Sequence, residues 1–187
     1  MRVSFDEATH TYWHGDKEVP GVTSILKAIG LSKDYSNVDT FYRDRGVAVA
    51  LAIELFLKGT LDEKTIDPVI LPYWEGFKRY WDKHAEKPVF IEEHLGHERL
   101  WFAGKADLVT EQRIVDWKVS KSYDKVSGLQ GEGYKTIFGL MPFRIVQFPG
   151  EGKFEIFEYD DKAETWPHVI AVYNWVRKTY PRKKING

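Results

Sequence analysis

The sequence contains no cysteine among its 187 residues, which excludes disulfide bonds, thiol catalysis and clusters held by Cys. It also lacks any run of about 18 apolar residues, the length that a transmembrane helix requires. Its first six residues have no apolar core of the kind found in signal peptides. These absences predict a protein without a membrane span and favour a reducing cytoplasm.

An excess of charge of one sign is missing as well, because 27 Lys and Arg face 28 Asp and Glu, for a net charge of −1. A neutral total does not exclude nucleic acid as a partner, since only the binding groove has to be basic. Local basic clusters do occur. One is formed by Lys118, Lys121, Lys125 and Lys135, and a second lies between residues 177 and 184. The second cluster is open to two interpretations, a solvated tail or a DNA contact.

The length predicts one domain, residues 1–187, with a sizeable core. Alternation over residues 2–20 predicts a hairpin, and a short helix capped by Thr23 or Ser24 completes an N-terminal unit of residues 1–30. Further helices are expected from Asp39 to Gly59, after Pro72, over residues 125–140 and around residues 166–176. Strands are expected at 89–95, 99–102, 104–109, 113–118, 143–148 and 154–159. This order predicts a mixed α/β fold with a central mixed sheet flanked by helices.

Three helices carry patterns of their own. Apolar positions of the first long helix include Phe41, Val47 and Leu51. The helix after Pro72 carries an aromatic stripe, for which core packing is favoured over base stacking. The helix over 125–140 contains four glycines, and each costs roughly 1 kcal/mol relative to Ala. So many glycines indicate close backbone packing.

The most informative segment runs from Gly104 to Lys118. It carries Asp107 in one apolar, strand-like stretch and Asp116 with Lys118 in the next, with a short polar turn between them. Side chains alternate along a strand, so Asp116 and Lys118 share a face, and a hairpin can bring Asp107 to that face. Two carboxylates and an ammonium then converge, a pattern that predicts a divalent-metal site with a cation beside it.

The predicted metal is Mg²⁺ or Mn²⁺, because both take hard oxygen ligands. Asp107 and Asp116 are the first two predicted ligands, and the backbone carbonyl of Trp117 is the third. A further carboxylate is expected from the preceding strand. Glu93 is preferred there over Glu92, because Glu93 shares the alternation of the neighbouring apolar residues.

The same pattern suggests a chemistry. A metal held by these ligands can polarise a phosphodiester, while Lys118 orients or deprotonates a water or stabilises charge in the transition state. Gln130 and Tyr134 lie four residues apart on one face of the helix that follows, where Gln130 can hold a water or a phosphate oxygen. A packed helix face would explain this pair equally well.

Asp-x-Lys alone is common and usually forms a surface ion pair. Here the neighbouring residues from Ile114 to Val119 are otherwise mostly apolar, so Asp116 and Lys118 are expected in a buried strand. Burying charge is costly unless a metal or a partner compensates. This context favours a functional site.

Together these residues resemble the PD-(D/E)XK nuclease superfamily, in particular the RecB-like and Cas4-like exonuclease branch often seen in phages. The family pattern stands here as Glu93, Gly104-x-x-Asp107, Asp116-x-Lys118 and Gln130-x-x-x-Tyr134. Residues 9–12 and 20–26 resemble the opening hairpin and helix of phage-type members, and Arg45-Gly46 resembles their Arg-Gly helix motif. The resemblance extends over most of the chain.

The resemblance implies metal-dependent hydrolysis of DNA by a restriction-endonuclease-like core, related to lambda exonuclease, with its catalytic part over residues 88–140. It implies DNA as the partner, and Arg45, Lys121 and Lys135 are the predicted contacts. The place of action would be the cytoplasm of a bacterium or of a phage-infected host. Many members of this branch trim single-stranded ends, so such an exonuclease is the leading hypothesis. Polarity and oligomeric state do not follow from these residues.

Two departures from the family pattern keep alternatives open. Ala50 stands where the Arg-Gly motif usually continues to a metal-binding His, and Glu54 lies one turn further on. The iron–sulfur cysteines of Cas4-like members are absent, so no cluster is expected. A DNA-binding protein of nuclease fold with weakened or lost catalysis is therefore the second hypothesis, and a structure-specific endonuclease is the third.

Overall fold

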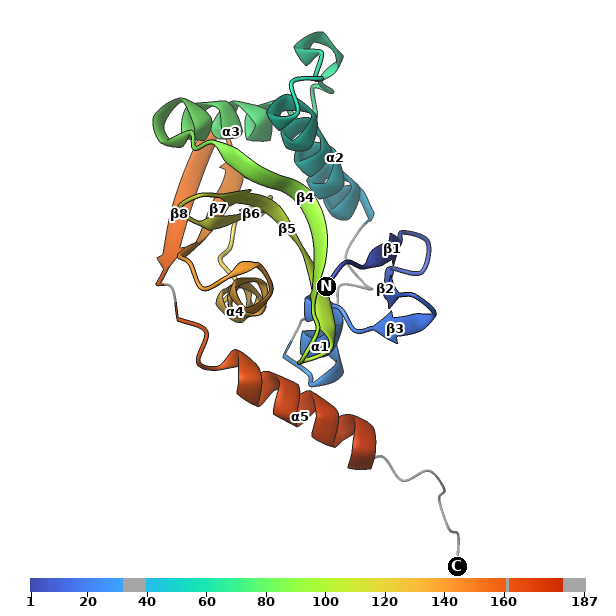
Figure 1. The fold of residues 1–187 in the computed structure, drawn as a ribbon. Helices are drawn as coiled ribbons and strands as arrows, with labels where there is room; N and C mark the ends of the chain where they lie inside the picture. The colour runs from blue at the N-terminus through green and yellow to red at the C-terminus, as the bar shows by residue number, and fades with distance from the viewer. Residues whose placement is uncertain (32–39, 161, 180–187) are drawn as a thin grey trace, which may run out of the picture.

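A five-stranded mixed sheet forms the centre of the computed structural model, which describes residues 1–31, 40–160 and 162–179 (Figure 1). Its strands lie in the order β4-β5-β6-β7-β8, with β6 parallel to β7 and all other neighbours antiparallel. The parallel pair is connected by helix α4, which crosses one face of the sheet. The predicted mixed sheet flanked by helices is confirmed. The strands are β4 (Pro88–His97), β5 (Phe102–Thr110), β6 (Ile114–Lys118), β7 (Phe143–Gly150) and β8 (Lys153–Tyr159).

Helices cover both faces of this sheet and create two separate apolar clusters. On one face, α3 (Leu71–His84) packs over β7 and β8, and α2 (Thr40–Leu57) packs against α3 and β4, around the buried Phe77. On the other face, α1 (Val22–Ala28), α4 (Val126–Phe138) and α5 (Trp166–Thr179) pack around the buried Trp166. A short 3-10 helix, Glu63–Thr65, lies between α2 and α3. The sheet is therefore buried on both sides.

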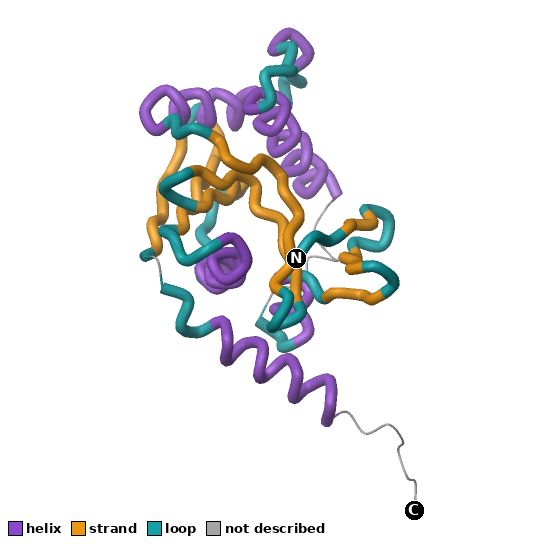
Figure 2. Tube along the Cα trace, in the orientation of Figure 1, coloured by secondary structure: helices purple, strands orange, loops and turns teal. Residues whose placement is uncertain are grey.

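The N-terminal residues form a small three-stranded sheet beside the ends of β4 and β5 (Figure 2). It consists of β1 (Ser4–Asp6), β2 (Thr11–His14) and β3 (Lys17–Val19). Isolated backbone bridges, Arg2 to Leu95 and Gly21 to Ala103, attach it to the central sheet. The predicted opening hairpin is confirmed as β2 and β3, with Gly15 at φ 63° in the turn.

Two predictions about local structure are wrong, and a third is untested. Helix α1 begins at Val22 after an N-cap at Gly21 that makes no side-chain capping bond, so Thr23 and Ser24 do not cap it. Residues 99–102 do not form a separate strand, because the chain turns there and β5 begins at Phe102. Asp39, the expected start of the first long helix, lies outside the described residues.

The apolar positions predicted for α2 are also wrong in part. Val47 and Leu51 are 63% and 50% exposed, whereas Val49 and Ile53 are buried against the sheet. Nearly all residues of this helix between Val47 and Phe56 are apolar, so the sequence pattern could not select its inner face.

The glycines of α4 and the aromatic residues of α3 behave as predicted. A Cβ on Gly131 would lie 2.1 Å from Cδ1 of Phe143, so α4 approaches β7 more closely than any other residue would allow. On α3, Trp74, Phe77 and Tyr80 are buried in the core. The prediction that the aromatic stripe faces the core is confirmed for these three residues.

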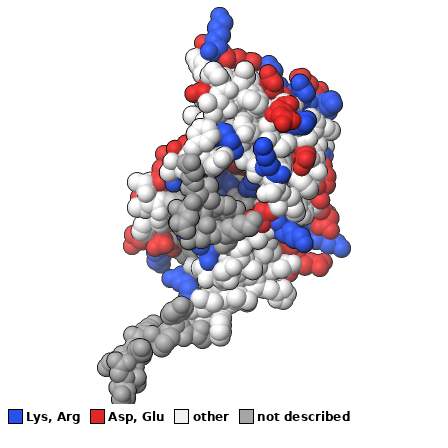
Figure 3. All heavy atoms as spheres, turned by 180° about the vertical axis from the view of Figure 1, so that it is seen from behind, with Lys and Arg blue, Asp and Glu red and all other residues white. Residues whose placement is uncertain are grey.

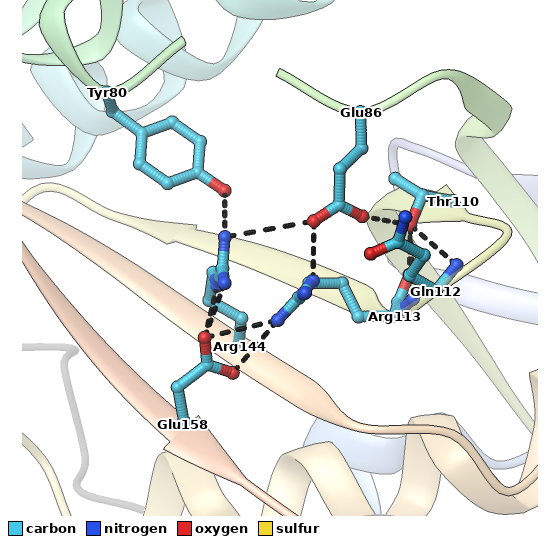
Figure 4. Close-up of polar contacts among 7 residues, drawn as sticks. All are labelled: Tyr80, Glu86, Thr110, Gln112, Arg113, Arg144 and Glu158. Carbon is cyan, nitrogen blue, oxygen red and sulfur yellow. Dashed lines mark hydrogen bonds and ion pairs between the residues drawn. The ribbon is translucent and has the colours of Figure 1, made fainter. Parts of the chain in front are cut away.

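A polar network fixes the end of β6 that lies away from Lys118 (Figure 4). Arg144 donates from Nε to Glu158 at 2.7 Å and from Nη1 to the Tyr80 hydroxyl at 3.0 Å. Arg113 donates from Nε to Glu86 at 2.6 Å and from Nη1 to Glu158 at 3.1 Å. These bonds join α3, β7, β8 and the turn before β6, which holds the strand that carries Asp116.

Candidate active site

Asp107 and Asp116 converge because β5 and β6 are antiparallel neighbours. The backbone pairing of these strands covers Val109 with Ile114 and Leu108 with Val115. Beyond it, the backbone N–H of Trp117 donates to Oδ2 of Asp107 at 2.7 Å. The Asp107 carboxylate thus connects the two strands where their backbone pairing has ended, and this bond fixes its position beside Asp116.

The two carboxylates lie in a buried environment, where their negative charges repel each other. Asp107 retains some exposed surface as a residue, but protein atoms surround its carboxyl group. Burial raises the pKa of Asp107 well above its ordinary value, and the charges of Asp116 and Glu92 add to this effect. Asp116 is only 3% exposed, and its Oδ2 lies 2.7 Å from the ammonium of Lys118. A cation placed here would relieve the repulsion between the carboxylates.

Lys118 is connected to α4 through a chain of hydrogen bonds. Its Nζ donates to Oε1 of Gln130 at 3.3 Å, and Nε2 of Gln130 donates to the Tyr134 hydroxyl at 2.7 Å. Burial raises the pKa of Tyr134 well above its ordinary value, with further contributions from Asp116 and Asp107, so the hydroxyl stays protonated. The structure therefore brings the predicted residues Asp116, Lys118, Gln130 and Tyr134 together.

Gly104 explains how α4 comes so close to the carboxylates. A Cβ at this position would lie 3.0 Å from Cε1 of Tyr134. A larger residue would require the side chains of Tyr134 and Ile137 to shift by a few tenths of an ångström. The Gly-x-x-Asp spacing thus combines a close contact with α4 and the carboxylate of Asp107.

The prediction that Glu93 supplies the third carboxylate is wrong. Glu93 is exposed, whereas Glu92 is half-buried and close enough to Asp107 and Asp116 to interact with their charges. The pairing of β4 with β5 keeps one register from Phe90 to His97, although Glu92 itself has φ 55°. Ile91 packs with Val115 and Trp117 in the cluster around Phe77, on the face of the sheet opposite to Asp116. Glu93 shares the face of Ile91, so alternation places Glu92 on the face of the two aspartates.

Two further side chains accompany Glu92. Lys105 of β5 forms an ion pair with Glu92, and although burial opposes its charge, this pair raises the pKa of Lys105. Burial in turn raises the pKa of Glu92, and the charges of Glu54 and Asp116 add to this effect. Glu54 of α2 is therefore near the site, and its Oε1 also pairs with Lys58 at 2.5 Å. The sequence shows Glu54 one turn after Ala50 but does not indicate how close it lies to the aspartates.

The predicted DNA contacts separate into two groups. Arg45 and Lys121 line a common pocket beside the loop that follows Lys118. Lys135 is 2% exposed and donates from Nζ to the carbonyl oxygen of Lys162 at 2.8 Å. The prediction that Lys135 contacts substrate is wrong, because its buried side chain binds the segment before α5.

The donor set suits a metal that takes few protein ligands. Over residues 1–31, 40–160 and 162–179, no group of three or more Asp, Glu, His or Cys side chains is arranged to hold a metal ion. Mg²⁺ usually binds through one or two carboxylates and keeps several waters. Asp107 and Asp116 satisfy that requirement, and Glu92, tied to Lys105, lies beside them. Oδ2 of Asp116 is buried and has an ion pair but no hydrogen bond, so it remains suitable as a ligand.

One face of the molecule is mixed in charge. In the view from behind, Lys and Arg side chains gather around a recess near the middle of the face, while Asp and Glu are spread along its edges (Figure 3). None of the helices in the described parts of the chain has the length and apolar character needed to cross a bilayer.

Comparison with known proteins adds evidence on the fold. No family model and no curated protein matches the sequence. The chain is similar to an alkaline exonuclease from Laribacter hongkongensis, LHK-Exo, with a TM-score of 0.50 and 10% identity over 84% of each chain. LHK-Exo in complex with dAMP gives a TM-score of 0.44 and 10% identity, over 86% of this chain and 92% of that chain. A structure from Eubacterium rectale, provisionally described as an exonuclease, gives a TM-score of 0.47 and 15% identity, over 88% of this chain and 82% of that chain.

The likeness to LHK-Exo shows that the two chains share a fold. Identity this low shows nothing about chemistry, which has to be argued from the residues of the site.

Proposed function

We propose that this protein is a metal-dependent deoxyribonuclease that removes nucleotides from the ends of single-stranded DNA. The observation that carries the proposal is the convergence of Asp107 and Asp116 in a buried strand pair, with the ammonium of Lys118 2.7 Å from Asp116. Two buried carboxylates that repel each other destabilise a fold unless they serve a ligand. The fold shared with LHK-Exo, an alkaline exonuclease, adds support.

Asp107 and Asp116 would hold Mg²⁺ or Mn²⁺, with Glu92 and the carbonyl of Trp117 as additional oxygen donors. An ion bound there supplies positive charge to the scissile phosphate and lowers the pKa of water. The hydrogen bond from Trp117 N–H leaves Oδ1 of Asp107 available and fixes the direction of the carboxylate. The protein thus contributes ligands that are positioned before the substrate arrives.

Lys118 would act on the attacking water and on the phosphate. Its ammonium contacts Asp116 and Gln130, which hold it beside the two carboxylates. When substrate binds, the ammonium can donate to the water or to a phosphate oxygen, and its charge stabilises the negative charge that develops in the transition state. Gln130, held in turn by Tyr134, orients Lys118 and takes no proton.

Replacing Lys118 by Ala in the purified protein tests this role. Cleavage of end-labelled linear DNA in Mg²⁺ or Mn²⁺ should fall by at least about 100-fold, the range typical of general acid–base and charge stabilisation. Lys17→Ala, at the exposed start of β3, is the matched control and should cleave like the natural protein. Equal rates for Lys118→Ala and the control would remove Lys118 from the mechanism.

The second candidate is a DNA-binding protein of nuclease fold with weakened or lost catalysis. Ala50 favours it, because a methyl group cannot bind metal where the resemblance implies a His. Glu54 lies one turn further along α2 and interacts with the charge of Glu92, so it can supply a carboxylate from the same helix. Metal-dependent cleavage by the natural protein separates the two candidates.

A further inference from the structure

A pocket of about 930 Å³ opens beside the loop that follows Lys118. Its lining comes from α2, α3 and the loop, and consists of Phe41, Tyr42, Arg43, Arg45, Tyr73, Val119, Ser120 and Lys121. Its volume is in the range of pockets that bind small ligands. None of its side chains takes part in the hydrogen bonds that join Asp116, Lys118, Gln130 and Tyr134.

Arg45 occupies an aromatic environment in this pocket. Its guanidinium carbon lies 4.6 Å from the ring centre of Tyr73, 5.1 Å from that of Tyr42 and 5.9 Å from that of Phe41. Its Nε is buried and has no hydrogen-bond partner, and no carboxylate of the described part of the chain forms an ion pair with it. Three aromatic rings thus surround the cation, and its charge is left for an anion to balance.

The rings on α2 are exposed in a way that core packing does not explain. Phe41 and Tyr42 are 51% and 54% exposed, and their ring centres lie 5.7 Å apart at an angle of 76°. Exposed aromatic rings next to cationic side chains are the usual elements of sites for single-stranded nucleic acid. Lys121, on the loop directly after the catalytic strand, supplies a second cation.

We propose that this pocket binds one unpaired nucleotide of the DNA strand, with its base stacked on Tyr42 and its phosphate bound by Arg45 and Lys121. The proposal rests on the proposed function only in that the ligand is DNA. A base in a duplex has both faces covered by its neighbours, so a stacking site of this kind selects single-stranded substrate. The position next to residues 119–121 places this nucleotide close to the bond that Lys118 serves.

Binding of single-stranded DNA by the Lys118→Ala protein tests the proposal without interference from cleavage. The probe is a fluorescein-labelled oligothymidylate of 12 nucleotides at fixed salt, followed by anisotropy. In this background Tyr42→Ala should weaken binding by roughly five- to 100-fold, the effect of losing one stacked base, whereas Tyr42→Phe should bind normally. Val47→Ala, an exposed position of the same helix outside the pocket, is the matched control.

A series of oligonucleotides that each lack one base identifies the stacked position. At one position, loss of the base should weaken binding, and Tyr42→Ala should then cause no further loss. A Tyr42→Ala penalty that persists on every member of the series, or that equals the penalty of Val47→Ala, would overturn the proposal. If Tyr42→Ala fails to fold, the series is measured with the Lys118→Ala protein, whose pocket is unchanged. Equal losses of affinity at all positions would then overturn the proposal.

This result is independent of the proposed function. A protein that shows the base-specific coupling but never cleaves DNA retains the binding site and rejects the nuclease. A protein that cleaves DNA without the coupling rejects the binding site and retains the nuclease.

Discussion

Asp107 has two separable roles, and two substitutions distinguish them. Asp107→Asn removes the charge but keeps an oxygen that can accept the 2.7 Å bond from Trp117 N–H, whereas Asp107→Ala removes both. An unpaired buried N–H costs about 1–3 kcal/mol. For a chain of this size, 1 kcal/mol changes Tm by about 2–4 °C. The Asn variant should therefore melt roughly 2–12 °C above the Ala variant, and neither should cleave DNA.

The difference in stability between the natural protein and the Asp107→Asn variant should depend on pH. Burial, with the charges of Asp116 and Glu92, raises the pKa of Asp107, so the folded state holds the proton more tightly than the unfolded state does. Stability from this group is present below the ordinary pKa of Asp and is lost as pH rises through the folded value. Without divalent metal, Asp107→Asn should thus be more stable than the natural protein at pH 8, and the difference should shrink toward pH 4.

Thermal denaturation in EDTA between pH 4 and pH 8 measures both effects. Asp16→Asn, on the exposed turn between β2 and β3, is the control for loss of a carboxylate and should show no such pH trend. An Ala variant as stable as the Asn variant would show that the bond to Trp117 carries no stability. A natural protein more stable than the Asn variant at pH 8 would refute the claim that the two carboxylates repel each other.

Other perturbations test separate parts of the structure. Gly131→Ala should lower stability by about 1–3 kcal/mol in chemical denaturation, because its Cβ would overlap the Phe143 ring; a stabilised variant would contradict that packing. Ala50→His should tighten Mn²⁺ binding in calorimetric titration, and an unchanged affinity would exclude that position as a ligand site. Arg144→Leu should lower the free energy of unfolding by roughly 1–3 kcal/mol, a range that allows for solvent screening of the 46% exposed Glu158. Cleavage per folded molecule should stay constant. A loss of cleavage in this folded variant would connect the network in Figure 4 to the site.

The parts of the site that sequence predicts are those that follow from regular periodicity. Alternation in β6 places Asp116 and Lys118 on one face, and four-residue spacing in α4 places Gln130 beside Tyr134. Both elements are regular in the structure, so these juxtapositions are found as predicted. Their roles in catalysis stay predictions.

The parts that sequence misses depend on tertiary contacts. Glu92 replaces Glu93 because the site lies on the face of the sheet opposite to Ile91, and local sequence does not tell which of the two faces carries the site. Lys135 is buried because the segment before α5 returns to cover α4, a contact across 27 positions. Glu54 is brought near the site by the docking of α2, whose inner face the uniformly apolar sequence could not specify.

The most direct test of the central claim compares two forms of one substrate. Purified protein is incubated with end-labelled linear single-stranded DNA and with closed circular single-stranded DNA, each in Mg²⁺, Mn²⁺ or EDTA. Loss of the linear form alone is expected, dependent on divalent metal, with the label position giving the polarity. Retained DNA binding without cleavage in any metal would contradict a nuclease centre at Asp107, Asp116 and Lys118, and cutting of the circle would contradict an exonuclease.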